Sequence, residues 1–282
     1  MDRLDQAREA VRRYPVPETL RTVGHVEVTG DELADALDYF VDLAFTDVET
    51  ESAVPLGASK YKGLPHLPPG LDWPAGHFFT AQFNLAELHP DDVFGAFPAT
   101  GVLYLFMPET TDVTVLHYDG PLDALRITPY PDAATLPGAE HYLADHLKQS
   151  SLLRYHPHYV FDLPSESHEV ADVAKLVPAE LKGQVGAVLR AKLATERHQG
   201  VRLFGPPTYW QGEEDGLDLR EYFGEDYYQD QDPARVEKML YTGRKYLLFQ
   251  DENYDGNTHV WIKADEAARR DYSDAWVTYS GT

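Results

Sequence analysis

The stretch SKYKGLPHLPPGLDWPAGHFFTAQFN (residues 59–84) decides how this chain is interpreted, because it joins a stiff loop to an apolar strand. It contains four prolines, three glycines and one tryptophan, and it runs into the apolar segment Phe78–Phe83. Proline fixes φ and glycine permits left-handed conformations, so the loop follows a fixed path rather than that of a flexible linker. We therefore predict an ordered loop that leads into a strand ending at Gln82.

A similar layout returns near the C-terminus. FGPPTYWQ (204–211) is followed by KYLLFQDE (245–252), so a Pro/Gly bend with a tryptophan again precedes an apolar strand that ends in glutamine. The repeated order predicts two related halves, in which the strands ending at Gln82 and Gln250 superpose and Trp73 and Trp210 occupy related places.

Composition bounds the class of protein. The chain has 282 residues, 43% hydrophobic and 12% aromatic, which is typical of a globular protein of one or two domains. It has no cysteine, which excludes disulfides and thiolate chemistry and suits a reducing compartment. The N-terminus shows no signal peptide, and no apolar run approaches the roughly 20 residues of a membrane span. We therefore expect a cytoplasmic protein with no membrane contact.

The formal net charge of −23 is the strongest compositional signal about partners. A surface this acidic repels nucleic acid and anionic membranes, and it attracts basic proteins. Solubility alone is the alternative explanation. The charge therefore predicts no nucleic-acid partner and leaves a basic protein partner open.

Periodicity gives a coarse map of helices and strands. Apolar spacing indicates helices at 2–14, 31–40, 178–197 and 264–270, and a weaker one at 137–151. Short β-branched and aromatic runs indicate strands at 43–48, 78–83, 101–107, 112–118, 125–130, 159–163, 245–250, 258–263 and 275–279. The runs between 101 and 130 leave no room for crossover helices, so they form an antiparallel meander.

The predicted fold class is α+β and rich in β, with largely antiparallel sheets in two internally duplicated halves and inserted helices. No low-complexity segment divides the chain, so 1–282 is expected to form one domain. Its expected parts are an N-terminal helical extension (1–42), a first half (43–135), a helical insertion (136–200) and a second half (201–282).

The ordered motifs resemble those of the YwqG-like family of bacterial proteins, a domain of unknown function. The matching positions are Ser59, Lys60, Gly63, Pro65, Leu67, Pro68, Trp73, Pro74, Ala81, Gln82, Asn84 and Leu85. Lys62 departs from the glycine common there, while Tyr61 and Phe83 are conservative changes. Later blocks match at Gly205, Pro207, Trp210, Gln211, Leu247–Asp251 and Val260–Tyr279. The resemblance implies a β-dominated, internally duplicated domain, and it implies no activity.

Two glutamines and two tryptophans are candidate ligand-binding residues. Gln82 and Gln250 each end an apolar strand, where a buried amide either ties a loop to the sheet or faces a cleft between the halves. Trp73 and Trp210 follow proline-rich bends, where the indole either covers the core or lines a groove. The structural interpretation is favoured in both cases.

The metal motifs are incomplete, and the sequence predicts no metal or cofactor. Asp251, Asn253 and Asp255 precede Gly256 in the pattern of a calcium loop, but Ile262 stands where the bidentate glutamate is required. A hairpin turn rich in Asn, Asp and Gly is the favoured explanation of the motif. His156 and His158 share a strand face, but no third ligand is placed by spacing.

Residues 213–232 combine acid with aromatic side chains, the composition of a charged rim around anchors. The candidate interaction residues there are Glu213, Glu214, Asp215, Glu221, Tyr222, Phe223, Tyr227 and Tyr228. A surface excursion whose aromatics turn inward is the alternative.

The sequence has no nucleophile elbow, P-loop, dinucleotide fingerprint or zinc-protease motif. We therefore expect a non-enzymatic binding or regulatory module for a basic protein partner. The alternative is an enzyme or small-ligand binder with a cleft between the two halves. Catalytic residues and oligomeric state stay undetermined at this level.

Overall fold

The structure is a computed structural model that describes residues 3–13, 30–35, 37–108, 112–136, 138–139, 143–144, 147, 150–161, 200–205, 245–253 and 256–281. The expected helix at 178–197, the segment 213–232, Trp210 and Asp255 lie outside these residues.

One large antiparallel sheet dominates the described residues, which confirms a β-rich α+β fold. Its ten strands follow the order β12-β11-β10-β9-β1-β8-β2-β4-β5-β6, and β3 and β7 form a separate pair. The strands are β1 Leu37–Val48, β2 Lys60–Tyr61, β3 His66–Leu67, β4 Phe78–Asn84, β5 Val102–Met107, β6 Thr114–Tyr118, β7 Arg126–Ile127, β8 Ser150–Phe161, β9 Arg202–Leu203, β10 Lys245–Asn253, β11 Gly256–Lys263 and β12 Trp276–Gly281.

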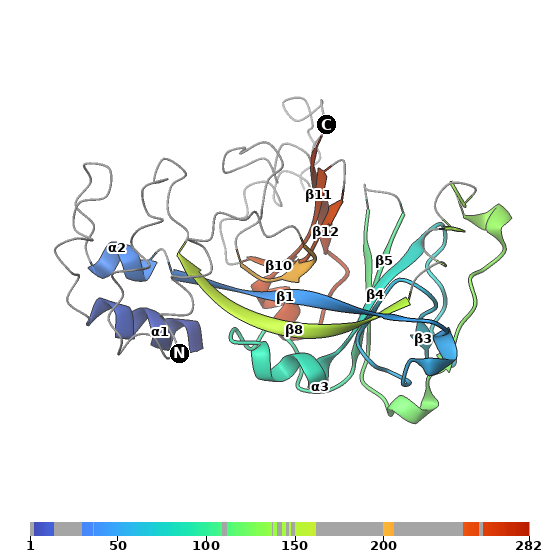
Figure 1. Ribbon diagram of the computed structural model, residues 1–282, viewed down its shortest axis with the longest axis horizontal. Helices are drawn as coiled ribbons and strands as arrows, with labels where there is room; N and C mark the ends of the chain where they lie inside the picture. Colours follow the sequence, from blue (N-terminus) through green and yellow to red (C-terminus); the bar gives the residue numbers. More distant parts are fainter. Residues whose placement is uncertain are drawn as a thin grey trace.

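Short helices lie around the sheet. The α-helices are α1 Arg3–Arg12, α2 Gly30–Asp35, α3 Leu85–Leu88 and α8 Ala264–Arg269, and the short 3-10 turns are η2 Glu51–Ala53, η3 His89–Asp91, η4 Leu122–Ala124 and η5 Ala133–Thr135. Figure 1 shows α1 and α2 beside the start of β1. Leu4 of α1 and Ala34 of α2 are buried in the main core, and Arg8 Nε donates to Leu37 O at 2.9 Å.

The longest strand pair overlaps two predicted helices at their ends, at residues 37–40 of β1 and 150–151 of β8. β1 and β8 pair along 12 residues each and run side by side across the molecule (Figure 1). The expected helix at 31–40 is therefore wrong beyond Asp35, and the strand expected at 43–48 begins six residues earlier, at Leu37. Leu37, Tyr39, Val41 and Leu43 lie at every second position and are all buried in the core, which is the periodicity of a strand rather than of a helix.

β8 also corrects the expected helical insertion at 136–200. Residues 150–161 of that segment are strand, so the predicted strand at 159–163 begins at Ser150 and includes the last two residues of the helix predicted at 137–151. The described residues 139, 143, 144 and 147 of that predicted helix are helical. Pro157 helped to hide this strand, because proline cannot donate to a ladder and is confined to free edges. In the described residues β2 pairs with β8 only at Ser151 and Leu152, so Pro157 faces β1 alone.

The predicted meander is correct for β5 and β6, which pair in sequence order, and β4 also pairs with β5. The run 125–130 does not continue it. Instead, β7 pairs with β3 in the small second sheet, where His66 lies opposite Ile127. The proline-rich loop supplies that partner, which spacing along the chain cannot reveal.

The sheet presents the same sequence of strands from either end towards the central β1–β8 pair. The short strand β2 pairs with β8 and then with the bulged strand β4, while the short strand β9 pairs with β1 and then with the bulged strand β10. Gln82 lies opposite Lys60, and Gln250 lies opposite Arg202. Both bulges fall just before the glutamine, between Phe79 and Ala81 and between Leu247 and Phe249.

The backbone after each short strand follows the same unusual path. Lys62 and Gly63 have φ values of 56° and 73°, and Phe204 and Gly205 have 61° and 73°. Such left-handed pairs are uncommon for non-glycine residues, so their recurrence reflects a shared turn out of the sheet.

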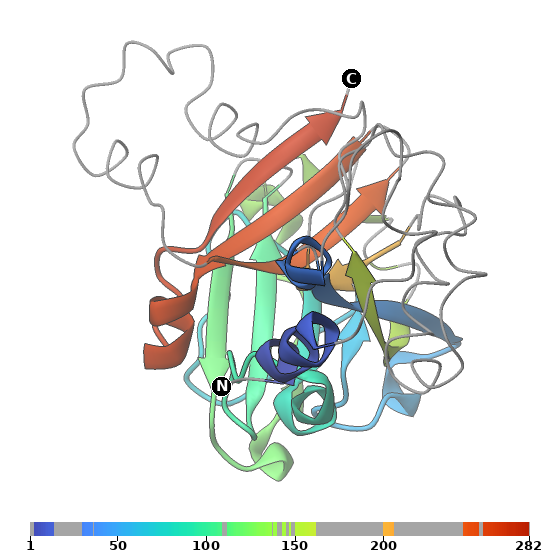
Figure 2. The same cartoon turned by 90° about the vertical axis from the view of Figure 1, so that its left-hand side faces the viewer.

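The sheet curls around its core. β2 and β10 are separated by three strands, which would place them roughly 19 Å apart in a flat sheet. Nevertheless Tyr61 Oη donates to Asp251 Oδ2 at 2.6 Å, and the rings of Phe83 and Phe249 lie 6.1 Å apart. Figure 2 shows β10–β12 in orange and red against the cyan and green strands, and one apolar cluster contains residues of both groups.

We predict that Gly63→Ala destabilises the protein by about 2–4 kcal/mol, since it adds left-handed strain to a steric clash. A Cβ at Gly63 would lie 2.5 Å from Glu51 Oε2 and 2.8 Å from Ser150 Cβ. The matched control is Gly70→Ala, because Gly70 has φ +87° and nothing within 4 Å of a Cβ. Urea denaturation of both variants separates the two contributions. Equal losses of stability would contradict the packing argument.

Candidate functional site

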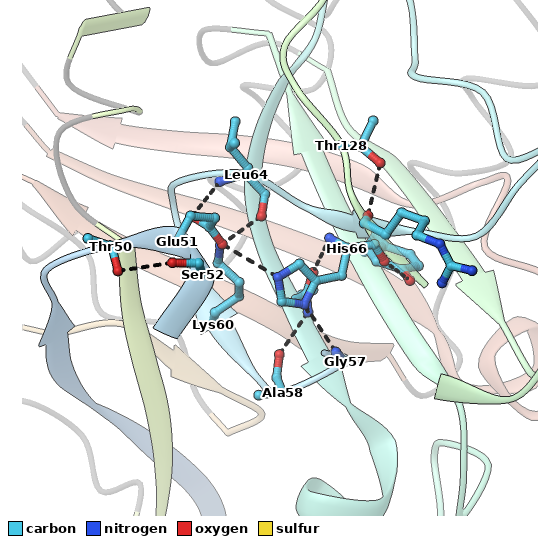
Figure 3. A network of polar contacts seen from close by, with 12 residues as sticks. Thr50, Glu51, Ser52, Gly57, Ala58, Lys60, Leu64, His66 and Thr128 are labelled. Carbon is cyan, nitrogen blue, oxygen red and sulfur yellow. Dashed lines mark hydrogen bonds and ion pairs between the residues drawn. The ribbon is translucent and has the colours of Figure 1, made fainter. Parts of the chain in front are cut away.

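A buried polar network lies where the Pro/Gly loop covers β2 and β4 (Figure 3). Lys60 of β2 has a side chain with 0% exposure, and its ammonium donates to Glu51 Oε1 and, at 2.7 Å, to Leu64 O. Glu51 Oε2 in turn accepts from Leu64 N at 3.0 Å. The turn η2 carries Glu51 over the strand, so this ion pair clamps two segments of the loop onto the sheet.

The protonation states in this network follow from its contacts. Burial by itself would raise the pKa of Glu51, but the groups that His66, Lys60 and the Leu64 amide direct at the carboxylate outweigh it and lower the pKa to about 2. Burial lowers the pKa of Lys60, and Glu51 opposes that shift. Glu51 is therefore ionised at neutral pH, and its carboxylate favours the protonated form of Lys60.

His66 forms the second layer of the network, and its side chain is also fully buried. Its Nδ1 accepts from Gly57 N at 3.1 Å, which places the proton of a neutral ring on Nε2. Nε2 lies 3.5 Å from Glu51 Oε1, at the limit of a hydrogen bond. Tyr104 Oη donates to His66 O at 2.6 Å, so the backbone of this residue is also fixed.

Gln82 joins the loop to the strand that it was predicted to end. Its Oε1 accepts from His66 N at 2.9 Å, and its Nε2 donates to Ala58 O at 2.8 Å. Nε2 also lies 3.4 Å from His66 Nδ1. The amide thus makes the contacts that the structural interpretation requires, and both of its ends are used within the chain.

The chemistry available to this network is limited by its burial. A lysine, a glutamate and a histidine together form an acid–base set, but Lys60 and His66 have fully buried side chains and Glu51 is 16% exposed. Each charge has a partner in the protein, which is how buried ions are accommodated. The arrangement holds the loop in place. The sequence motif included Lys60 and Gln82, whereas Glu51 carried no local signal because it lies on a separate turn.

Trp73 lies on the outer layer of the first half. The centroid of its ring lies 5.1 Å from that of Phe106, in an edge-on contact, and 4.6 Å from that of Tyr130, in a tilted contact. Its Nε1 donates to His77 O at 2.8 Å. These contacts cover the second apolar cluster, which includes Phe79 and Tyr104. The indole therefore holds the proline-rich loop against the sheet.

Gln250 is the counterpart of Gln82 by register, and it is also fully buried. Its Oε1 accepts from Arg202 Nη2 at 3.1 Å, and the guanidinium of Arg202 lies 5.3 Å from the ring centre of Phe40. The structure does not bring Gln82 and Gln250 together with Trp73 at one cleft. Trp210 lies outside the described residues.

The calcium motif forms part of a β-hairpin. Asn253 pairs with Gly256 at one end of the β10–β11 ladder, and Asp251 Oδ2 accepts from Tyr61 Oη. In the described part of the chain no group of three or more His, Cys, Asp or Glu residues has a metal-binding arrangement. The candidate interaction residues Glu213, Glu214, Asp215, Glu221, Tyr222, Phe223, Tyr227 and Tyr228 lie outside the described residues.

Comparison with known families assigns most of the chain to one of them. Residues 59–280 match the family described as Domain of unknown function (DUF1963). The chain belongs to this family. No curated protein shows significant sequence similarity to the chain. The matched range begins at Ser59, so the DUF1963 region includes Lys60, His66 and Gln82 but not Glu51.

Among the described helices, none has the length and apolar character needed to cross a membrane.

We predict that Glu51 contributes stability that is lost in acid. Its pKa is about 2 in the folded protein against an ordinary 4.5. The contribution is therefore complete above pH 4.5 and disappears as the pH falls from 4.5 to 2, with a size on the order of 3 kcal/mol. In urea denaturation, Glu51→Gln should be less stable than wild type at pH 7, and the difference should shrink below pH 4.5. The exposed residue Glu49 supplies the control Glu49→Gln, and a constant difference across this range would refute the prediction.

We predict that Trp73→Ala costs about 3–5 kcal/mol, as for other large aromatic truncations. Trp73→Phe keeps a ring against Phe106 and Tyr130 but loses the donor to His77 O, so it should cost about 1 kcal/mol. Thermal or urea melts of both variants measure this. If Trp73→Ala lowered the free energy of unfolding by less than about 1 kcal/mol, the structural role would be contradicted and a ligand contact would be favoured instead.

Proposed function

We propose that this DUF1963 protein is a non-enzymatic binding module whose acidic surface recognises a basic protein partner. The observation that carries the proposal is the net charge of −23, set against an interior whose charged groups are engaged with one another. A buried ion pair such as Lys60–Glu51 contains one positive and one negative charge, so it leaves the net charge of the protein unchanged. That excess creates a negative potential which speeds encounter with cations.

The candidate ligand-binding residues support this choice over a cleft enzyme. Gln82 uses both ends of its amide on the loop, and Trp73 uses its indole N–H on His77 O. Gln250 is engaged with Arg202. If one of these side chains turned to bind a ligand, its present hydrogen-bond partner would be left buried and unpaired, which is unfavourable in free energy.

The proposal treats the domain as two related halves. Its support is the matched registers Lys60–Gln82 and Arg202–Gln250, with a bulge before each glutamine. Two backbone hydrogen bonds also occupy matching positions, since Leu153 N donates to Ser59 O and Leu43 N donates to Val201 O. In this arrangement β1, which precedes β2 in the chain, pairs with β9, and β8, which precedes β9, pairs with β2.

The proposed setting is the cytoplasm of a bacterium, as for the YwqG-like proteins that the chain resembles. A cysteine-free sequence is compatible with that reducing compartment.

The acidic-aromatic segment is the proposed centre of recognition. We predict that neutralising Glu213, Glu214, Asp215 and Glu221 slows association with a basic partner recovered from native lysate, because steering is electrostatic. Tyr227→Ala with Tyr228→Ala should speed dissociation, because anchors act on the off-rate. Raising salt should weaken binding, since charges are screened beyond about 8 Å at physiological ionic strength. Surface plasmon resonance measures all three effects.

The matched control removes the same charge elsewhere. Asp31, Glu49, Asp72 and Asp123 are exposed in the described residues, and changing all four to amides also removes four negative charges. The control should slow association less than the segment variant does. Binding that is indifferent to salt and to both sets of changes would leave the charge as a solubility device and reject the proposal.

A further inference from the structure

One end of the curled sheet carries polar and aromatic groups that the buried network does not use. Tyr61 Oη donates to Asp251 Oδ2, and the ring of Phe45 packs edge-on against the Tyr61 ring at 5.1 Å. Lys62 Nζ lies 5.1 Å from the centre of the Tyr61 ring. We call Phe45, Asp47, Tyr61, Lys62 and Asp251 the Tyr61–Asp251 mouth.

The mouth is open at the surface. Phe45 is 41% exposed, which makes it one of few large apolar side chains at the surface of the described residues. Tyr61, Lys62 and Asp251 are half-buried, and Asp47 is exposed. Register places Asp47, Ser151 and Tyr61 side by side on one face of β1, β8 and β2, and Ser151 Oγ donates to Asp47 Oδ1 at 2.8 Å. A surface group therefore meets the exposed Phe45 ring and Asp47 first, with the half-buried Tyr61 and Asp251 behind them.

The architecture does not require these groups. The positions that match Tyr61, Lys62 and Asp251 by register are Leu203, Phe204 and Phe83, all of them apolar and buried. The left-handed backbone is the same at Lys62 and Phe204, so only the side chains differ. The chain therefore builds the same turn and strand end with apolar residues in one place and with a carboxylate, a phenol and a lysine in the other.

The chemistry of the mouth favours a cation. An aromatic face attracts an ammonium group through its quadrupole, and a nearby carboxylate adds charge attraction. Burial raises the pKa of Asp251, while the Tyr61 hydroxyl and the charge of Lys62 oppose that shift. Lys62 already shows the geometry, because its own ammonium lies over the Tyr61 ring in the free chain.

We propose that the Tyr61–Asp251 mouth receives a lysine side chain of the basic partner, and that Lys62 occupies the site until the partner displaces it. This proposal rests on the proposed function and names a second contact for it. The partner's ammonium lies between Asp251 and the rings of Phe45 and Tyr61. Lys62 acts as an internal competitor, so its removal strengthens binding although it lies within the site.

The test uses the full-length protein and a fluorescein-labelled hexalysine peptide, with fluorescence anisotropy at 50 mM and 150 mM salt. Asp251→Asn keeps an acceptor for Tyr61 Oη but removes the charge, and it should weaken binding about 5-fold. Phe45→Ala should weaken it about 3-fold, and Lys62→Met should tighten it about 3-fold. Phe45 is exposed, so its variant stays informative if Asp251→Asn is poorly folded in a thermal melt.

The control is Asp31→Asn, which also removes one negative charge. Asp31 lies on α2, at the opposite end of β1 from Phe45 (Figure 1), and its side chain is 81% exposed. It should change affinity by less than about 1.5-fold, as expected for an exposed charge. Weaker binding of Phe45→Ala, together with a larger loss for Asp251→Asn than for Asp31→Asn, would support the proposal. Bulk electrostatics predicts tighter binding for Lys62→Met and similar small losses for the two aspartate variants, but it cannot explain an effect of Phe45→Ala.

Two failures are distinguishable. Salt-dependent binding of hexalysine that Phe45→Ala and Asp251→Asn leave unchanged overturns the mouth as the lysine site and keeps the proposed function. Failure of wild type to bind hexalysine at 50 mM salt overturns both. Weaker binding of Lys62→Met would show that Lys62 does not compete and would also overturn the proposal.

Discussion

The ladder between β1 and β8 is the interaction on which the rest of the sheet depends. It joins 12 residues of each strand, and every other strand of the large sheet extends outward from one of these two. β2, β4, β5 and β6 follow from β8, and β9, β10, β11 and β12 follow from β1. Because the pair crosses the centre, the sheet curls about it and brings both outer groups of strands around one core. Removal of either long strand would divide the large sheet into two separate parts.

The sheet carries two sets of polar groups, and their physical roles differ. The Lys60–Glu51 pair, His66 and Gln82 are buried and bond one another, so their contribution is to hold the Pro/Gly loop in one conformation. Buried pairs of this kind bring little net stability over apolar packing, but the loss of one partner is costly. The Tyr61–Asp251 contact is half-buried and has apolar counterparts at the matched positions. The first group therefore belongs to the architecture, and the second is the proposed recognition site.

The acidity of the chain acts at a longer range than either group. A net charge of −23 is a property of the whole surface, and it governs encounter rates rather than the fold. The mouth would add a short-range contact to this long-range steering. Binding by the DUF1963 domain would then depend on two separable quantities, the rate of encounter set by total charge and the lifetime of the complex set by aromatic contacts.

The sequence by itself determined the local elements whose signals are contained within a few residues. Alternation and β-branched content identified β5, β6 and β11, the Pro/Gly loop before Gln82 was correctly expected to be ordered, and the helix expected at 264–270 is α8. Only the tertiary structure decided what joins these elements. The sequence predicted only parts of β1 and β8, at 43–48 and 159–163, and their full length was set by their pairing with each other; β7 pairs with a strand of the proline-rich loop. Tyr61 and Asp251 are 190 residues apart, and Glu51 reaches Lys60 from a different turn, so no local pattern could place them together. Such contacts form only when the sheet closes, because burial of the shared core outweighs the entropy of bringing distant segments together.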